Sequence, residues 1–532
     1  RQKKRDRHRC SDSFSLHEKF IFSLLIVTAH ALLNGYDAIS LIYPTLFNHL
    51  TDFMNLTLSK RALAGLPLAI ALAGCAPSHD IGNPLQQQTP ASHIAMELPA
   101  AVKNGWPQSN WWQDYHDPQL NSLIQRALAN APDMQIAGQR IKLAEAQARM
   151  SQSTLGPNLD FSADIERQKM SSEGLMGPFA TDTDGNTGPW YTNGTFGLTA
   201  GWDLDLWGKN RALLQARIGE VKAQVAEEAQ TRELLASSVA RLYWQWQTEA
   251  AIKNVLTQMK REQNNVVTVD TALYQRGITN SAEGAENDIN VSKTDQQLAD
   301  VAGSMKEIEA RLMALTNNQS QALNLHPADL PAVSAQMPNE LGYELLARRP
   351  DLQVAHWYIE ASLSEIDAAK AAFYPDINLM AFLQQDALHL SDLFRHSAQQ
   401  MGVTAGLTLP IFDSGRLNAN LDIASAQNGL SIAKYNKAVV DAVNQVAKTA
   451  SQVETLMAKN QQQQQVEKDA QRMVALAQAR MNAGIISGSR VSLAKLPALQ
   501  ERITALRLRG QWLDASIQLT SALGGGYHQA AK

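Results

Sequence analysis

Few residues of this chain have the types and the spacing that chemistry requires. The twelve histidines are scattered, with no metal-spaced pair on a convincing helix face, and no Walker motif occurs. Gly524-Gly525-Gly526 lacks the Lys and the Ser or Thr of a phosphate loop, so we interpret it as a helix stop. Asp133 and Asp351 each follow a proline and are expected to satisfy free N–H groups at helix starts. The sequence therefore predicts no catalytic residue, no cofactor and no metal, and the mixed charges, with a net charge of -4, do not indicate nucleic acid.

Cys75, one of only two cysteines, is the exception, because its thiol could be acylated. It follows an apolar run over 62–73 that is preceded by the basic pair Lys60-Arg61, the pattern of a secretory signal. Leu72-Ala73-Gly74-Cys75 resembles the lipobox of bacterial lipoproteins, in which the cysteine receives diacylglycerol. By resemblance to bacterial sorting rules, Ala76 after it indicates the outer membrane. The alternative is an ordinary signal peptide with a chance cysteine.

The N-terminal region divides into three expected segments. Residues 1–53 are interpreted as a non-native upstream extension, with translation starting at Met54. Residues 54–74 form the signal peptide, and residues 75–104, rich in Pro, Ser, Gln and Asn, form a lipidated tether. At the other end of the chain, residues 527–532 are expected to form a C-terminal tail.

Two stretches alternate strictly between apolar and polar residues, a period that is typical of a strand with one wet face. They cover about 195–207 and 401–412, and Gly402 of the second repeats Gly197 of the first 205 positions later. A shorter stretch that follows a proline precedes each of them: about 158–168, which alternates, and about 376–386, where alternation is weaker. Four amphipathic strands of about ten residues are thus expected, each long enough to cross a bilayer when tilted.

The whole chain repeats itself in order. Pro132-Asp133 recurs as Pro350-Asp351, 218 positions later. The first repeat is expected at 105–316 and the second at 341–526, joined by a proline-containing linker at 317–340. Each repeat reads helix, strand, loop, strand, long helix, glycine turn and return helix.

Long proline-free runs follow the second strand of each repeat and predict helices on the order of 100 Å long. The first long helix is preceded, before the strands, by a single helix expected at about 117–154. The apolar residues of the first long helix recur at spacings of three, four or seven, as in a coiled-coil seam. This seam starts with Leu214, Ile218, Val221 and Val225. Gly277 and Gly484 stand where helix ends need a left-handed residue. The long and return helices are expected at 209–276, 281–316, 414–483 and 488–523.

Four strands leave two open edges, which lipid cannot satisfy, so a barrel would have to be shared between chains. Two chains would give a filled barrel of eight strands, whereas three would give twelve strands and a lumen. Trp207 and Phe412 are expected at matching strand ends, in an aromatic belt. The alternative is a soluble α+β lipoprotein with a small sheet. The residues expected to face a wet lumen are polar, namely Asp160, Ser162, Asp164, Thr199, Asp203, Thr404 and Thr408.

Three motifs, Asp203–Gly208, Leu345–Leu352 and Leu409–Arg416, resemble signatures of the TolC-like outer membrane factor family. The lipobox places the chain in the lipoprotein (NodT-like) branch, and the resemblance covers residues 76–526. It implies a mixed α/β membrane protein, a homotrimer whose twelve-stranded outer-membrane β-barrel, with four strands per chain, continues as a twelve-helix periplasmic α-barrel. It also implies outer-membrane lipid, a periplasmic adaptor (membrane fusion) protein and an inner-membrane pump as partners, with passive efflux of drugs or toxic compounds. A protein-secretion duct of the same fold and a non-channel lipid-anchored helical scaffold are the alternatives.

Members of that family meet their adaptor through helix-turn tips. Here the tips fall on Arg276-Gly277-Ile278-Thr279 and Gly484-Ile485-Ile486-Ser487. Some members carry acidic residues just past the tips, which narrow the periplasmic aperture. Glu283 stands near that place in the first repeat, but Arg490 stands there in the second, so we expect a different ion selectivity.

Overall fold

The computed structural model describes residues 85–88, 102–169, 171, 190–318, 322–332, 335–338 and 342–528, all within the unit Pro77–Lys532. Cys75 lies outside the described residues, as do the expected extension over 1–53 and the expected signal peptide over 54–74. Most of the loop between the first two strands and the last four residues also lie outside them. None of the described helices combines the length and the apolar character needed to cross a membrane.

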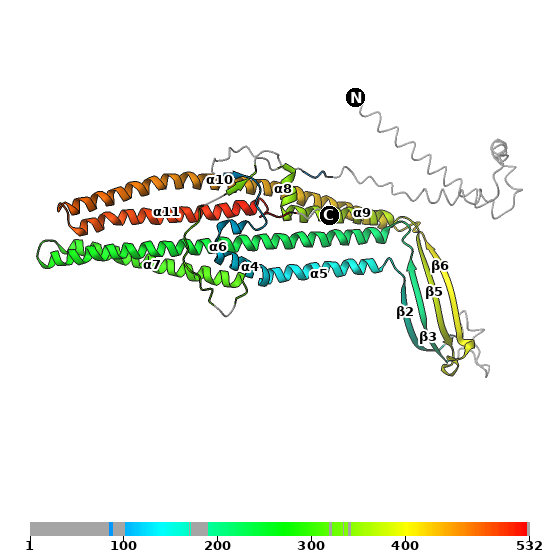
Figure 1. Ribbon diagram of the computed structural model, residues 1–532. Coiled ribbons are helices and arrows are strands. Elements are labelled where there is room, and N and C mark those ends of the chain that lie inside the picture. The colour runs from blue at the N-terminus through cyan, green and yellow to red at the C-terminus, as the bar shows by residue number, and fades with distance from the viewer. Residues whose placement is uncertain are drawn as a thin grey trace, which may run out of the picture. The chain divides into compact units, whose positions relative to one another are not determined.

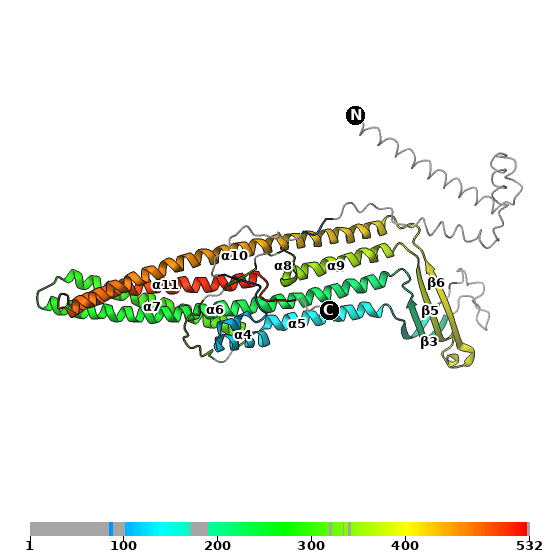
Figure 2. The same cartoon turned by 45° about the horizontal axis from the view of Figure 1, so that its top comes forward.

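The two repeats have equal helices. The long helices α6 (Lys209–Gln275) and α10 (Arg416–Asn482) have 67 residues each, and the return helices α7 (Ser281–Leu315) and α11 (Gly488–Ala522) have 35 each. At 1.5 Å per residue, each long helix measures on the order of 100 Å. Near the sheet α5, α6, α9 and α10 lie side by side, and farther away α7 and α11 replace α5 and α9 as neighbours (Figures 1 and 2). The shorter helices are α4 (Pro118–Asn130), α5 (Pro132–Ser153), α8 (Gly342–Arg348) and α9 (Pro350–Ala371), with 3-10 turns at Trp111–Tyr115, Leu390–Asp392 and His396–Ala398.

The prediction of one continuous helix at about 117–154 is wrong, because this part of the chain forms two helices, α4 and α5. Ala131 has an extended backbone (φ -57°, ψ 136°), as a residue before proline prefers, and Pro132 starts α5. The side chain that caps a helix start in this region is Asp117, whose carboxylate accepts from the Gln119 and Leu120 N–H groups. Asp133 lies in the first turn of α5.

One four-stranded antiparallel sheet has the order β2-β3-β5-β6. Its strands are β2 (Asn158–Lys169), β3 (Trp190–Asp203), β5 (Asp376–Ala387) and β6 (Gln399–Thr408). The register differs by two residues between the repeats, since Asn158 lies opposite Gly201 but its equivalent Asp376 lies opposite Thr408. A shift of two residues keeps every side chain on its face.

The expected ends of two strands, at 207 and 412, are wrong, because β3 ends at Asp203 and β6 at Thr408. Asp205 has a positive φ of 42° and its carboxylate accepts from the N–H groups of Asn210 and Arg211. The side chain thus caps α6 where the pattern alone would continue the strand. In the second repeat, Pro410 has no N–H to donate to a ladder.

The predicted seam is wrong over the first turns of α6. Val225 is 48% exposed, and Leu214, Ile218 and Val221 are only half-buried. Here α6 packs between α5 and α9, and a Cβ placed on Gly219 would lie 3.0 Å from the Cβ of Ala361. Such close helix approach favours small residues, and those that are buried in this stretch are Ala216, Gly219, Ala223 and Ala226.

A small parallel pairing that the sequence did not predict joins β1 (Val102–Asn104) to β4 (Ala335–Met337). The first strand lies in the expected tether and the second in the expected linker. Three-residue strands are too short to show alternation, so periodicity could not reveal them.

Candidate functional site

The sheet has one apolar face and one mainly polar face, on which Met380 and Phe382 are apolar exceptions, and the register keeps the two faces separate. Across the four strands, Phe161, Leu198, Leu383 and Met401 lie in one row. Opposite residues of antiparallel strands share a face, so this row continues through the apolar residues two positions away on each strand. The exposed fractions are 66% for Phe161, 42% for Leu198, 44% for Leu383 and 68% for Met401. A soluble sheet would cover such a face; here the described part of the chain leaves it open.

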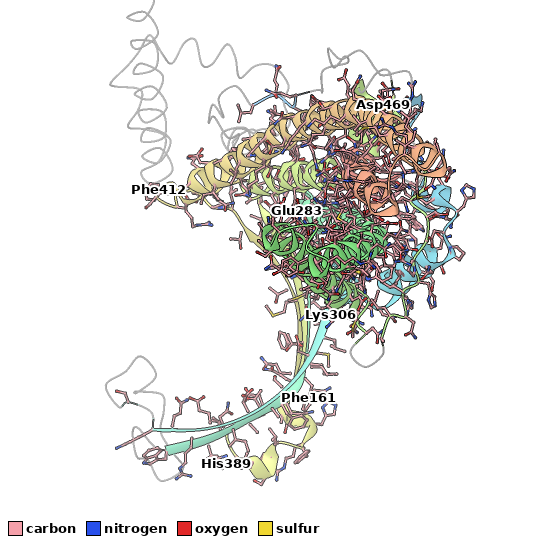
Figure 3. The ribbon with its side chains drawn as sticks, turned by 90° about the vertical axis from the view of Figure 1, so that its left-hand side faces the viewer. Phe161, Glu283, Lys306, His389, Phe412 and Asp469 are labelled. Atoms are coloured by element: carbon pink, nitrogen blue, oxygen red, sulfur yellow. The ribbon has the colours of Figure 1, made fainter. Side chains whose placement is uncertain are left out.

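The other face carries the polar residues that the sequence assigns to a lumen, together with four glycines. Each of these glycines lies beneath a neighbouring residue: a Cβ on Gly402 would lie 2.8 Å from the Phe382 ring, and one on Gly406 would overlap Asn378 Oδ1. Gly197 and Gly201 are approached in the same way by Gln384 and Asn158. Glycines on one face let strands bend toward that face, and the strands are strongly curved (Figure 3).

The two predicted belt aromatics differ in their surroundings. Trp207 stacks on Tyr374 with ring centroids 5.0 Å apart, and its indole N–H donates to the Pro375 carbonyl at 2.7 Å. Phe412, in the equivalent turn of the second repeat, is 88% exposed, and Ile411 beside it is 90% exposed. Both aromatics lie four residues past the end of a strand, so the structure places them at the junction between sheet and helices.

The two helix-turn tips have the same backbone geometry. Gly277 N–H donates to Tyr274 and Ile278 N–H to Leu273, each at 2.9 Å. Gly484 and Ile485 repeat this pattern with Met481 and Arg480, also at 2.9 Å. The glycines have φ of 72° and 73°, the left-handed conformation of a Schellman motif.

The tips present apolar side chains to solvent, since Ile278 is 65% and Ile485 67% exposed. The expected aperture residues follow them on the first turns of the return helices: Glu283, whose N–H donates to the Asn280 side chain, and Arg490, whose N–H donates to the Ser487 carbonyl. Both side chains are exposed. Within one chain the structure does not bring Glu283 and Arg490 into a common contact.

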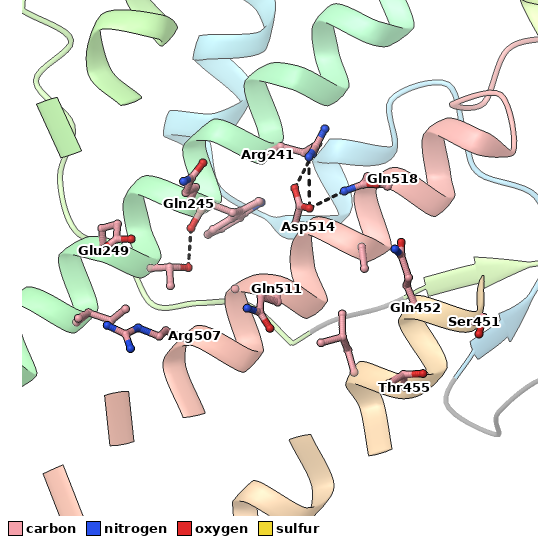
Figure 4. A pocket seen from close by; sticks show the side chains of 16 residues that line it. Arg241, Gln245, Glu249, Ser451, Gln452, Thr455, Arg507, Gln511, Asp514 and Gln518 are labelled. Atoms are coloured by element: carbon pink, nitrogen blue, oxygen red, sulfur yellow. Dashed lines mark hydrogen bonds and ion pairs between the residues drawn. The ribbon is translucent and has the colours of Figure 1, made fainter. Parts of the chain in front are cut away.

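A cavity of about 730 Å³ lies between α6, α10 and α11, at mid-length of the tube (Figure 4). Arg241 forms an ion pair with Asp514, and Gln518 donates to the same carboxylate at 2.6 Å. Burial raises the pKa of Glu249, and Arg507 opposes that shift. Sequence reasoning missed this cavity because its walls come from residues more than 200 positions apart. Its lining mixes polar with apolar residues, its two arginines are balanced by Glu249 and Asp514, and it shows no arrangement for catalysis.

A second polar cluster joins the repeats where α11 ends. The Ser521 hydroxyl donates to Glu233 Oε2 at 3.0 Å, while Glu233 Oε1 is buried without a partner. Arg349 pairs with Asp351 at 2.7 Å and donates to the Ala522 carbonyl at 2.6 Å. Burial raises the pKa of Glu233 to about 7, although Ser521 and Arg349 lower it and Asp351 raises it further.

A two-faced sheet that continues into helices on the order of 100 Å long defines one protomer of an outer-membrane channel. The model of the family "Outer membrane efflux protein" matches residues 123–318 and 341–525. The multidrug resistance outer membrane protein MdtQ of Escherichia coli O157:H7 is 70% identical over 468 residues, which cover 88% of this chain and 98% of that protein. The chain belongs to the outer membrane efflux protein family.

Solved structures agree with this assignment. The outer membrane protein VceC from Vibrio cholerae superimposes with a TM-score of 0.69 at 26% identity, over 79% of this chain and all of that one. The CmeC outer membrane channel of Campylobacter jejuni gives a TM-score of 0.74 at 20% identity, over 86% of this chain and 96% of that one. The predicted family, the trimeric barrel fold and the outer-membrane location are thereby confirmed.

We predict that Arg490→Asp shifts the pore toward cations. The exposed side chain lies in the first turn of α11, where an acidic residue suits the helix dipole, so the substitution should not weaken the fold. Reversal potentials in a salt gradient across a planar bilayer would measure the shift, and Arg490→Gln should give about half of it. An unchanged cation preference would contradict the assignment of Arg490 to the aperture.

We predict that stability falls as pH rises through the titration of Glu233. The folded pKa of about 7 lies above the ordinary value of 4.5, so the folded state holds its proton more tightly than the unfolded state. The loss in the free energy of unfolding is absent below pH 4.5 and complete above pH 7, where it amounts to about 3 kcal/mol. Glu233→Gln should raise the melting temperature at pH 8 and flatten its pH dependence. Parallel melting curves of the two proteins would count against this account.

Proposed function

We propose that three copies of this chain form the outer-membrane channel of a tripartite efflux system, which conducts drugs or toxic compounds passively to the exterior. The relatives named as multidrug resistance outer membrane proteins support this substrate class. The observation that carries the proposal is the sheet, which is apolar on one face, polar on the other and open at both edges. No step of the proposed transport is catalytic, and a partner supplies the energy.

The internal repeat gives the register in which the copies join. Inside the chain, β3 pairs with β5, and Ala200 lies opposite Ala381. Moving β3 forward by 205 positions and β5 back by 218 places Ala405 of β6 opposite Ala163 of β2 in a second copy. The same operation sets Val403 opposite Ile165 and Leu407 opposite Phe161, so apolar residues meet apolar residues across the junction.

The outer helices carry matching unpartnered stripes. On α5, Ile136, Leu143 and Met150 recur every seven residues and are 52%, 61% and 76% exposed. Leu143 and Met150 are the repeat equivalents of Ala361 and Ala368, which are only 5% and 6% exposed on α9 beside α6. By the same operation the stripe on α5 packs against α10 of the next copy. There Ile423 and Leu430 are 68% and 47% exposed.

The two tips and Cys75 complete the proposal at the two ends of the tube. Ile278 and Ile485 offer paired apolar contacts to a periplasmic adaptor, which in turn connects to an inner-membrane pump. Their shared Schellman geometry presents both side chains in the same way, as a repeating partner surface requires. Cys75 carries the lipid that anchors each chain in the outer membrane, and buried methylenes of about 0.8 kcal/mol each make that anchor stable.

Disulfide formation between edge strands tests the channel. Ala163→Cys combined with Ala405→Cys is expected to give covalent oligomers that end at the trimer on a non-reducing gel, because opposed Cβ atoms lie about 5 Å apart. Ala200→Cys with Ala405→Cys is the matched control and should not cross-link, since Ala200 lies on an inner strand. Cross-links at Phe161 or Ile165 in place of Ala163 would overturn the register. A trimer that conducts no ions in a planar bilayer would overturn the channel and favour a scaffold.

Adaptor docking at the tips predicts a separate defect. Ile485→Glu and Ile278→Glu should each reduce drug efflux in cells by about tenfold or more, because each substitution places a charge in an apolar contact. Both side chains are about two-thirds exposed, so the trimer and its single-channel conductance should persist. Efflux at the native level in both variants would show that the adaptor docks elsewhere.

A further inference from the structure

A short segment of the N-terminal tether lies against the long helix α10. The Gln88 N–H donates to Asn436 Oδ1 at 2.7 Å, and Asn436 Nδ2 donates to the Gln86 carbonyl at 2.9 Å. One side-chain amide thus satisfies two backbone groups on residues i and i+2, as a neighbouring strand would. The side chains over 85–88 are exposed, so the attachment does not depend on apolar burial.

The repeat shows that this amide is specific to one half of the chain. The equivalent position on α6, 205 residues earlier, is Thr231, whose hydroxyl donates to the Glu227 carbonyl of its own helix at 2.9 Å. A chain has two long helices but only one N-terminal segment. The amide therefore occurs only on α10, the long helix against which residues 85–88 lie.

We propose that Asn436 is the docking site of the N-terminal tether and fixes the height at which Cys75 meets the membrane. The second part rests on the lipidation of Cys75 proposed above. Asn436 lies 20 residues after the start of α10 at Arg416, about 30 Å along the helix axis from the junction with the sheet. Gln86 lies eleven positions after Cys75, and this stretch of chain spans at most about 40 Å.

The reach of the tether therefore exceeds the required distance by only about 10 Å. From Asn436, the lipid on Cys75 can reach the level of the junction where Ile411 and Phe412 are exposed, but little beyond it. Since lipid surrounds the barrel and does not fill its lumen, the surface of α10 around Asn436 faces the outside of the tube. The docking site thus orients α10 as well as holding the tether.

Hydrogen exchange tests the docking directly. Asn436→Ala removes both bonds and should speed exchange of the Gln88 amide about fivefold to tenfold. Asn436→Asp keeps an acceptor for Gln88 but no donor for Gln86, so Gln88 should remain slow. Thr231→Ala is the matched control on α6 and should change nothing at residues 85–88. Gln88 exchange that is unaffected by Asn436→Ala would overturn the docking site.

Shortening the tether tests the height. Deletion of residues 78–81 brings Gln86 to seven positions after Cys75, a span of at most about 25 Å, which is shorter than the roughly 30 Å required. In the lipidated trimer this deletion should abolish protection of Gln88. Deletion of 92–95, of equal length but beyond the docked segment, should not. In Cys75→Ser protein, exported with an ordinary cleavable signal, the first deletion should leave protection intact.

Palmitate labelling separates the two proposals. A chain without label overturns lipidation and leaves the docking at Asn436, which the exchange experiment tests by itself. A labelled chain that retains Gln88 protection after deletion of 78–81 overturns the height assignment and leaves lipidation and the channel intact.

Discussion

The backbone N–H and C=O groups along the free edges of β2 and β6 set the conditions for the rest of the structure. In the described part of the chain each of these strands pairs on one side only. In hydrocarbon each unpaired group costs several kcal/mol, and four strands cannot curve far enough to pair their own edges. The exposed apolar row through Phe161 and Leu198 places these edges in lipid. The fold is therefore completed by neighbouring copies, and the repeat supplies the geometry because each contact between halves has a counterpart between chains.

Differences between the repeats are then more informative than their likeness. Trp207 packs on its own chain, whereas its equivalent Phe412 stays exposed. Thr231 bonds within its helix, whereas Asn436 holds the tether. Each pair occupies the same position in the fold, so helix geometry cannot account for the difference. What differs is the neighbour: in the first repeat Tyr374 contacts Trp207 and the Glu227 carbonyl contacts Thr231, whereas in the second the tether contacts Asn436 and the Phe412 side chain is exposed.

Local patterns predicted the parts of this fold that local physics determines. Alternation located the four strands, the lack of proline located the long helices, and the glycines located both tips. The rest depends on contacts that no window of sequence contains. The end of β3 depends on the Asp205 carboxylate, the packing of α6 depends on the approach of Ala361 to Gly219, and the cavity between α6, α10 and α11 depends on the helical hairpins. The roles assigned to Cys75, the tips and the aperture come from a resemblance and stay predictions, and Asn436 was missed because nothing periodic distinguishes it.

Stability is distributed unevenly along the tube, and this bears on how a partner could act on it. Around mid-length, a core that includes Tyr243 and Leu312 is fully buried. Toward the tips buried apolar residues become few, and partly exposed ion pairs join the helices, such as Lys495 with Glu262 and Arg502 with Glu467. Ion pairs that keep contact with water contribute about 1 kcal/mol each, so separating helices near the tips costs less than separating them at the core. The adaptor that we propose at the tip isoleucines would therefore act where the helices separate most easily, away from the mid-length core.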